Sequence, residues 1–188
     1  METGFISQIT ILPSGACKNP MKNIILIGMP GAGKSTAGVI LAKAMGRNFI
    51  DTDIVIQENS GQLLQDIIDT AGSASFLRIE EKTILSLHFQ NAVVATGGSV
   101  VFSRRAMEHL QRDGVVIYLK ISCEDMVRRL GNIRTRGIVL VAGQSLREMY
   151  DQRAPLYAKY ADITVDCSGG DFETVVGDVL DRLRAFQA

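Results

Sequence analysis

Short apolar runs alternate along the chain with longer stretches whose apolar residues recur at helical spacing. A short apolar run ended by glycine or a turn is typical of a buried strand, and a recurrence every three or four residues is typical of a helix. Strands are predicted at 23–28, 48–53, 92–98, 114–121 and 162–167. Helical patterns cover 34–46, 60–89 with a break at 70–75, 123–131, 145–161 and 171–186. Because strands separated by helices form parallel sheets covered on both faces, we predict an α/β fold, three-layer α/β/α with a five-stranded parallel sheet.

The first twenty residues do not follow this alternation. Pro13, Gly15 and Pro20 interrupt them, and they lack the basic start and long apolar block of a signal peptide. We predict that residues 1–20 are a flexible N-terminal extension; Met21 stands where a compact domain would begin, so the extension is either a native arm or lies before the real start. No repeat or linker divides residues 21–188, which we expect to form a single domain.

Composition narrows the function classes. The chain has 188 residues, 46% of them hydrophobic, with Lys+Arg and Asp+Glu both at 20. A formal net charge of zero favours neither nucleic acid nor a membrane surface as partner, and no run approaches the roughly 20 apolar residues of a membrane span. Three scattered cysteines fit neither a zinc site nor a disulfide framework, which favours reduced thiols in the cytoplasm. We expect a cytoplasmic protein that binds small molecules.

The stretch "ILIGMPGAGKST" lies between the first strand and the first helix and matches G-x-x-x-x-G-K-[ST] through Gly28, Gly33, Lys34 and Ser35. Such a loop turns its backbone N–H groups around phosphates at the positive end of a helix dipole. The lysine reaches the β- and γ-phosphates, and the serine hydroxyl holds magnesium. The predicted ATP-binding residues of the loop are Gly31, Ala32, Gly33, Lys34, Ser35 and Thr36.

A metal at such a loop usually needs a carboxylate as well. The third strand ends at Thr96 without one, whereas "FIDTD" offers Asp51 and Asp53. Asp51 and Asp53 are two residues apart, so on a strand both would point to the same face. In a parallel sheet the C-terminal end of this strand lies beside the phosphate-binding loop. We predict that Asp51 holds the metal and that Asp53, further out, orients or deprotonates an acceptor hydroxyl.

The loop is followed in order by "FIDTD", "FLRIEE", "ATGG" and "RAPLYAKYAD". This succession resembles the shikimate kinase family, of the P-loop kinase type with a nucleoside-monophosphate-kinase-like fold, from about residue 22 to the C-terminus. The resemblance implies that MgATP phosphorylates the 3-hydroxyl of shikimate, a cyclohexene carboxylate, with ATP and Mg2+ as cofactors and a step in aromatic amino acid biosynthesis as the role.

The resemblance also implies an acceptor site. Arg78 would clamp the carboxylate of the substrate, held in turn by Glu81, and Arg153 would be the second arginine of the clamp, which suits a carboxylate because guanidinium donors pair with both oxygens. The family's glycine triplet reads Gly97, Gly98 and Ser99 here, so the third position departs from the family pattern. Expected substrate-binding residues are Asp53, Arg78, Gly97, Gly98 and Arg153.

A lid is expected near residues 130–146, where the sequence departs furthest from the family. Arg136 stands at the place of the first lid arginine, followed by Gly137 instead of proline, and Arg134 is the other arginine that could contact phosphate. A lid arginine would stabilise the charge on the transferring phosphoryl group. Together with Lys34 and Asp53, Arg136 completes the predicted catalytic residues.

Two other functions stay open. A related small-metabolite kinase, such as a gluconate-type kinase, shares the P-loop and an acid–arginine arrangement but phosphorylates a different hydroxy acid. A nucleotide-binding regulatory protein without turnover would need only the loop, and an acceptor clamp argues against it. In each case we expect a monomer.

Overall fold

The computed structural model describes residues 22–131, 138–139, 143–169 and 171–187, with helix membership alone at position 187. The predicted extension at residues 1–20 lies outside this range, as does most of the predicted lid. The division into an extension and a single domain therefore stays a prediction. Among the described residues, no helix is long and apolar enough to cross a membrane.

A five-stranded sheet forms the centre of the molecule, in the order β2-β3-β1-β4-β5, with every neighbouring pair parallel. The predicted sheet is thus confirmed. Its middle strands β1 and β3 are buried along their whole length because helices cover both faces, as expected for a parallel sheet. The strands are β1 (Asn23–Ile27), β2 (Asn48–Asp51), β3 (Ala92–Ala95), β4 (Gly114–Lys120) and β5 (Ile163–Asp166).

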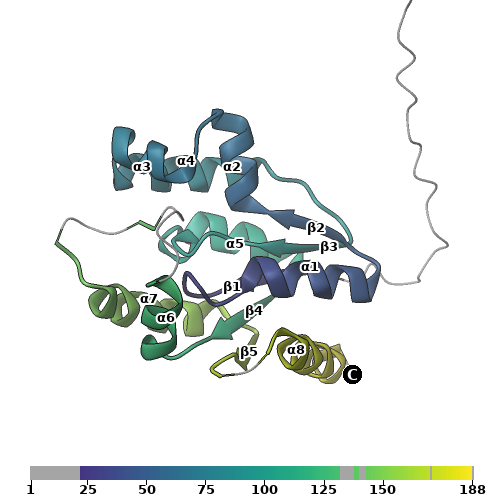
Figure 1. Cartoon of the computed structure of the whole chain (residues 1–188). Coiled ribbons are helices and arrows are strands. Elements are labelled where there is room, and N and C mark those ends of the chain that lie inside the picture. The colour runs from purple at the N-terminus through teal and green to yellow at the C-terminus, as the bar shows by residue number, and fades with distance from the viewer. Residues whose placement is uncertain (1–21, 132–137, 140–142, 170, 188) are drawn as a thin grey trace, which may run out of the picture.

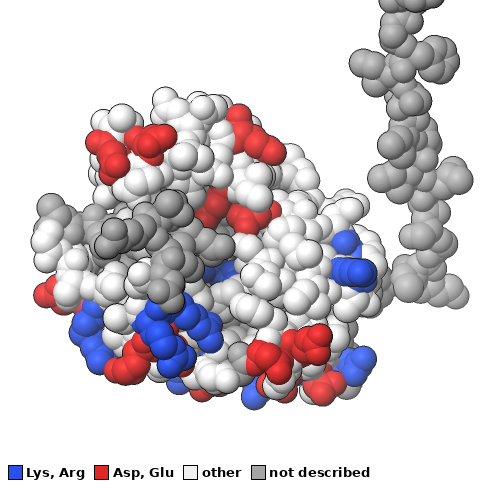
Figure 2. Space-filling model, in the orientation of Figure 1, with Lys and Arg blue, Asp and Glu red and all other residues white. Residues whose placement is uncertain are grey.

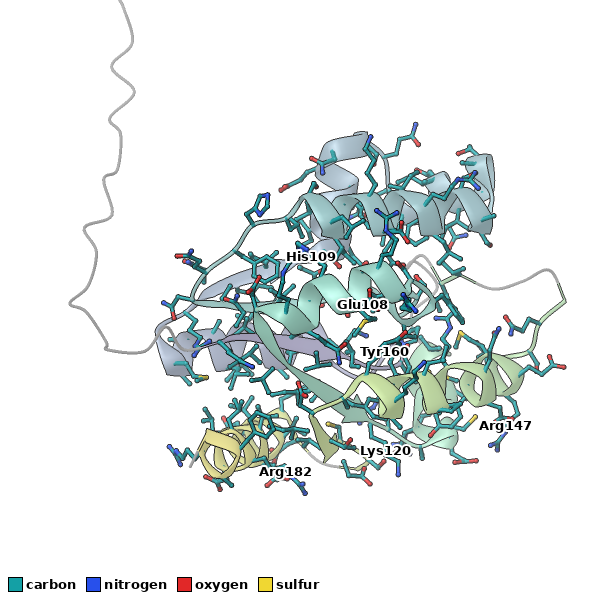
Figure 3. The ribbon with its side chains drawn as sticks, turned by 180° about the vertical axis from the view of Figure 1, so that it is seen from behind. Glu108, His109, Lys120, Arg147, Tyr160 and Arg182 are labelled. Carbon is teal, nitrogen blue, oxygen red and sulfur yellow. The ribbon has the colours of Figure 1, made fainter. Side chains whose placement is uncertain are left out.

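Helices lie on both faces of the sheet and in a lobe above one edge (Figure 1). In chain order they are α1 (Lys34–Met45), α2 (Thr52–Ser60), α3 (Leu64–Ala71), α4 (Ser73–Ser86), the 3-10 turn η1 (Val100–Phe102), α5 (Arg104–Arg112), α6 (Cys123–Leu130), α7 (Leu146–Tyr160) and α8 (Phe172–Gln187). Helices α1 and α8 pack together on one face. Viewed from behind, α5 with Glu108 and His109 and α7 with Arg147 and Tyr160 lie in front of the sheet (Figure 3), which makes three layers.

The helical prediction needs correction after β2. The predicted strand over 48–53 ends at Asp51, and a helix that the sequence analysis did not predict, α2, follows at once. The helical stretch predicted over 60–89 forms α3 and α4, which meet at Gly72, inside the predicted break at 70–75. No element was predicted over 104–112, where α5 forms.

Two apolar clusters hold these elements together. The larger one fills both sides of the sheet and includes all residues of β1 except Asn23. The smaller one joins α2, α3 and α4 through Ile56, Ile67 and Phe76, and Val139 from the predicted lid packs into it. The lobe of α2, α3 and α4 therefore has its own core, and it stands over the end of the sheet where the strands β1, β2 and β3 terminate (Figure 1).

Candidate active site

The phosphate-binding loop connects the central strand β1 to α1 at the C-terminal edge of the sheet. Gly33 has φ +88°, a left-handed conformation that favours glycine, and a Cβ there would lie 2.4 Å from the Phe172 ring. Lys34 is buried, and its Nζ donates hydrogen bonds to the carbonyl oxygens of Gly28 and Met29 at 2.8 and 3.0 Å. The ammonium group is thus fixed inside the loop.

The hydroxyl of Ser35 and the carboxylate of Asp51 meet beside this loop. Ser35 Oγ donates a hydrogen bond of 2.6 Å to Asp51 Oδ2. The contact is possible because strands β1 and β2 both pair with β3 in register, Leu26 and Asp51 each opposite Ala95, so that the two strands end at the same edge. Two hard oxygen donors side by side suit a magnesium ion.

Asp53 is not a strand residue. Asp51 caps α2, accepting a hydrogen bond of 3.0 Å from the Asp53 backbone N–H, so Asp53 lies in the first turn of that helix. The prediction that both carboxylates share one face of a strand was wrong in this respect, because an aspartate at a strand end favours a helix cap. Asp53 nevertheless reaches the site, where it lines a pocket of about 50 Å³ with Lys34 and Ser35.

Gly97 and Gly98 follow β3 and form another wall of the site. A Cβ on Gly97 would lie 2.3 Å from Glu80 Oε1 and 2.8 Å from Asp53 Oδ1, so a side chain at this position would collide with two carboxyl groups. A Cβ on Gly98 would lie 3.0 Å from Pro30 of the loop and 3.4 Å from Arg153 Nη1. Neighbouring protein groups thus leave no room for a side chain at Gly97 and little at Gly98, while the close approach of a ligand to this backbone stays a prediction.

Arg153 projects from α7 toward the same region and is only 2% exposed. One guanidinium nitrogen donates to the carbonyl oxygen of Val139, Cζ lies 5.2 Å from the centre of the Phe102 ring, and Nε has no hydrogen-bond partner. No carboxylate in the described ranges forms an ion pair with Arg153. A buried arginine without an acidic partner is costly to keep unless it binds an anion.

The predicted pair of Arg78 and Glu81 does not form. Arg78 donates to Ser75 Oγ at 2.9 Å on the outer side of α4. Glu81 accepts from Ser103 Oγ at 2.6 Å and from Arg105 Nη1 at 3.0 Å. Side chains three residues apart face one another on a helix, but Glu81 instead binds the N-cap residue Ser103 and Arg105 at the start of α5.

Glu80 is the carboxyl group of α4 that the sequence analysis missed. It is 2% exposed, and Oε2 accepts a hydrogen bond of 2.7 Å from Ser99 Oγ. Burial is the largest of several influences that raise its pKa to about 8. A signal was present, because Glu80 follows Phe76 and precedes Ile84 by four residues each and so belongs to the apolar face of the helix.

A second cavity, of about 320 Å³, adjoins this carboxyl group. Its lining combines apolar and polar side chains from α4, η1 and the segments on either side of η1: Leu77, Arg78, Glu80, Glu81, Ser99, Phe102 and Ser103. Figure 2 shows acidic atoms in the hollow between the α2–α4 lobe and the sheet, with basic atoms deeper inside. Pro30 of the phosphate-binding loop and Arg153 approach the same position beside Gly98, and Asp53 lines one pocket with Lys34 and Ser35.

Two further side chains support the donor loop. Arg129 of α6 donates to the carbonyl oxygens of Gly31 at 3.2 Å and Cys167 at 3.0 Å, tying the loop to the end of β5. Phe172, at the start of α8, packs on Gly33 while 42% of it remains exposed. Arg134 and Arg136, the predicted lid arginines, lie outside the described residues.

A phosphate-binding loop at the head of a helix, with an acidic residue lining the same pocket, suits phosphoryl transfer from a nucleotide to an acceptor hydroxyl. The fold and the site therefore define a P-loop kinase. The family model for shikimate kinase matches residues 30–184, and the chain belongs to the shikimate kinase family. The predicted resemblance, the fold class and the class of enzyme, a kinase, are confirmed.

Individual relatives agree with this assignment. A shikimate kinase from Thiobacillus denitrificans is 42% identical over 147 residues, covering 77% of this chain and 80% of its own. A shikimate kinase from Mycobacterium avium is 39% identical over 169 residues, covering 87% of this chain and 94% of its own. The solved structure of shikimate kinase from Acinetobacter baumannii in complex with shikimate has 30% identity and a TM-score of 0.81, covering 87% of this chain and 93% of that one.

Proposed function

We propose that this kinase transfers the γ-phosphoryl group of ATP to the 3-hydroxyl of shikimate, giving shikimate 3-phosphate and ADP. The observation that carries the proposal is the buried guanidinium of Arg153, which lies beside Gly98 and forms no ion pair in the described ranges. An anionic acceptor would supply the missing charge. Relatives named shikimate kinase, and a similar structure in complex with shikimate, make a cyclic hydroxy acid the best candidate.

The proposed reaction divides its tasks among the residues around Gly97 and Gly98. Arg153 holds the acceptor carboxylate, which orients the ring, and Asp53 accepts the proton of the attacking hydroxyl. The hydroxyl oxygen forms a bond to the γ-phosphorus while the bond from that phosphorus to the β–γ bridging oxygen breaks, leaving ADP. Lys34 stabilises negative charge on the phosphate oxygens. Such transition states gain most from position and charge, which is what these roles supply.

We propose Mg2+ as the metal of the donor side. Ser35 Oγ and Asp51 Oδ2, 2.6 Å apart, are hard oxygen donors beside the loop and fit an ion that prefers oxygen and keeps several waters. When bound, the ion neutralises charge on the triphosphate. Asp51 would hold it directly or through water, and Ser35 through its hydroxyl.

Two predicted roles remain proposals without a described contact to the site. Arg136, from the lid, would stabilise the transferring phosphoryl group. Arg78 would reach the acceptor from the second cavity, which it lines, after leaving Ser75. We also propose that the protein acts as a cytoplasmic monomer, because donor and acceptor residues come from one chain and both described cysteines, Cys123 and Cys167, are free thiols.

ADP release by the purified protein, measured with shikimate, quinate, gluconate and homoserine as separate acceptors, tests the proposal. Shikimate should give by far the highest kcat/KM. Turnover on gluconate or another hydroxy acid, with none on shikimate, would instead identify a related kinase with a changed acceptor. ATP binding without turnover on any acceptor would favour a regulatory protein.

Asp53→Ala provides the matching test of mechanism. We expect turnover to fall by at least about 10³-fold, the upper part of the range for a lost general base. ATP affinity should stay near that of the unaltered protein, because Asp51 and Ser35, the proposed metal holders, remain. A variant that retained most of its turnover would remove Asp53 from the mechanism.

A further inference from the structure

The carboxyl group of Glu80 is buried without a cation. Its Oε2 accepts the hydrogen bond from Ser99 Oγ, while Oε1 is buried and has no hydrogen-bond partner. No lysine or arginine of the described residues forms an ion pair with it. A buried ionised carboxylate normally needs a cation or several donors, and one serine hydroxyl does not replace them. The setting therefore favours the uncharged, protonated acid.

The groups facing Glu80 come from several elements. Asp53 approaches from α2, and both Asp53 Oδ1 and Glu80 Oε1 lie within 3 Å of the position that a Cβ on Gly97 would take. The two oxygens are therefore at most about 5 Å apart, a range in which like charges oppose each other's ionisation. Arg153 from α7 and Lys34 from α1 act in the opposite direction at longer range.

The neighbours of Glu80 on its own helix offer it no charge. Arg78 is directed toward Ser75, and Glu81 is engaged by Ser103 and Arg105. Desolvation by burial is the largest influence on the Glu80 pKa, followed by the lowering effect of the Ser99 hydrogen bond and then the raising effect of Asp53. The resulting pKa of about 8 agrees with the geometry.

We propose that Glu80 is a positioning residue that carries a proton in the working enzyme: Ser99 holds Oε2, and the protonated Oε1 side donates a hydrogen bond toward the acceptor. The inference rests on the proposed function, because it concerns the anionic acceptor of that same site. Keeping Glu80 uncharged leaves Asp53 as the ionised member of the pair, able to accept the proton of the hydroxyl. Ser99 is thus a functional part of the acceptor wall.

The proposal makes acceptor binding sensitive to pH. Once Glu80 ionises, its charge opposes both Asp53 and the acceptor carboxylate, so the acceptor binds more weakly. A bound anion in turn holds the proton on Glu80. The loss should therefore appear in kcat/KM for the acceptor, which reports the ionisation of the free enzyme, and much less in kcat, which reports the complex.

Three variants test this with the full-length protein and shikimate as acceptor, with kcat and KM measured between pH 6.5 and 9.5. The unaltered enzyme should lose kcat/KM for shikimate by about tenfold per pH unit above the ionisation of Glu80, through KM. Glu80→Gln, a permanently uncharged analogue, should show no such alkaline loss. Ser99→Ala should move the loss to higher pH, because the Ser99 hydrogen bond lowers the Glu80 pKa. Glu81→Gln is the matched control and should keep the pH dependence of the unaltered enzyme.

The outcomes separate this inference from the proposed function. If the enzyme turns over shikimate but Glu80→Gln keeps the same alkaline loss, the inference is wrong and the proposed function stands. The inference is also wrong if kcat/KM of the unaltered enzyme for shikimate does not fall at alkaline pH. If no ADP forms with shikimate at any pH, the proposed function fails and the inference fails with it. Should Glu80→Gln not fold, a Ser99→Ala profile unchanged from the unaltered enzyme would count against the proposal.

Discussion

Ser35 and Asp51 lie 16 residues apart in the chain, and the hydrogen bond of 2.6 Å between them joins the first turn of α1 to the end of β2. The same carboxylate uses its other oxygen to cap α2. One aspartate therefore sets the distance between the phosphate-binding loop and the helix that carries Asp53. This side chain therefore links the phosphate-binding loop to the helix that carries the proposed general base.

Removing the hydroxyl of this pair should weaken the response to Mg2+. In Ser35→Ala we expect the Mg2+ concentration for half-maximal activity to rise by about tenfold, the effect of losing one ligand worth about 1.4 kcal/mol. Ser35→Thr keeps the hydroxyl and should stay near the unaltered value. Titration of activity with Mg2+ at saturating ATP measures this, and equal values for the alanine and threonine variants would contradict the assignment.

Arg153 should matter for acceptor binding far more than for stability. Arg153→Met removes a charge that is hydrogen-bonded to the proposed acceptor, so KM for shikimate should rise by about 100-fold, since bonds to charged groups contribute about 1.5–3 kcal/mol each. ATP affinity should change little. Because Nε has no partner in the free protein, the melting temperature without ligand should not fall and is expected to rise. Steady-state kinetics and thermal unfolding give the two readouts.

An exposed arginine on the same helix is the control. Arg147 pairs with Glu124 at 2.8 Å on the surface, where such pairs contribute little. Arg147→Ala should leave KM for shikimate unchanged.

Arg78→Ala tests the remaining clamp prediction. An increase in KM for shikimate comparable to that of Arg153→Met would show that Arg78 leaves Ser75 and joins the acceptor. A small increase would leave Arg153 as the main anchor.

Gly97→Ala should lower both stability and activity. Its Cβ would stand 2.3 Å from Glu80 Oε1, and displacing a buried side chain costs about 1–3 kcal/mol of unfolding free energy. Gly177→Ala is the matched control, because its Cβ meets nothing within 4 Å in the middle of α8 and alanine favours a helix. Denaturant unfolding of both variants checks this. Equal unfolding free energies would show that Glu80 and Asp53 can move away from residue 97 at little cost.

Glu80 should also make the stability of the protein depend on pH. Its pKa is raised from 4.5 to about 8 by burial, so the folded state binds more protons than the unfolded state between these values. The stabilisation is complete below pH 4.5 and is lost as pH rises through 8, so the free energy of unfolding should fall across this window by at most about 1.4 kcal/mol per pH unit.

Comparison of the variants Glu80→Gln and Glu81→Gln isolates the contribution of Glu80 to this pH dependence. Glu80→Gln should remove the decline in unfolding free energy between pH 5 and pH 8, whereas Glu81→Gln should retain it. Denaturant unfolding at several pH values measures the slope. A decline of the same size in Glu80→Gln would assign it to another group.

Some parts of the site could be predicted because their chemistry is local. The loop from Gly28 to Ser35 is specified by glycines that permit left-handed backbone and by a lysine and serine at set distances along the chain. The alternation of apolar runs and helical patterns was likewise enough to predict the five-stranded parallel sheet, because strands that are covered by helices on both faces are continuous apolar runs in the sequence. Arg153 lies beside Gly98, and the binding of an acceptor by Arg153 and the two glycines stays a prediction from the family resemblance.

Other parts depended on contacts between distant segments. Asp51 could continue a strand or begin a helix, and the choice follows from its hydrogen bond to Ser35 across the end of β3. A proline usually disturbs a helix interior, yet α7 continues through Pro155. Arg153 and Tyr157 are buried on the inner face of this helix, whereas Asp151 and Pro155 are exposed.

Two neighbouring residues on α4 show most clearly what the sequence determined and what the tertiary structure decided. The chain carries Glu80 and Glu81 side by side, and the motif selected Glu81 as the partner of Arg78. Packing turned Glu80 into the core against Ser99 and left Glu81 outside with Ser103 and Arg105. Backbone conformation and hydrophobic spacing are local properties that a sequence carries directly. The ionisation of a carboxyl group depends on which charges and hydroxyls surround it in space, and those come from α2, α7 and the end of β3.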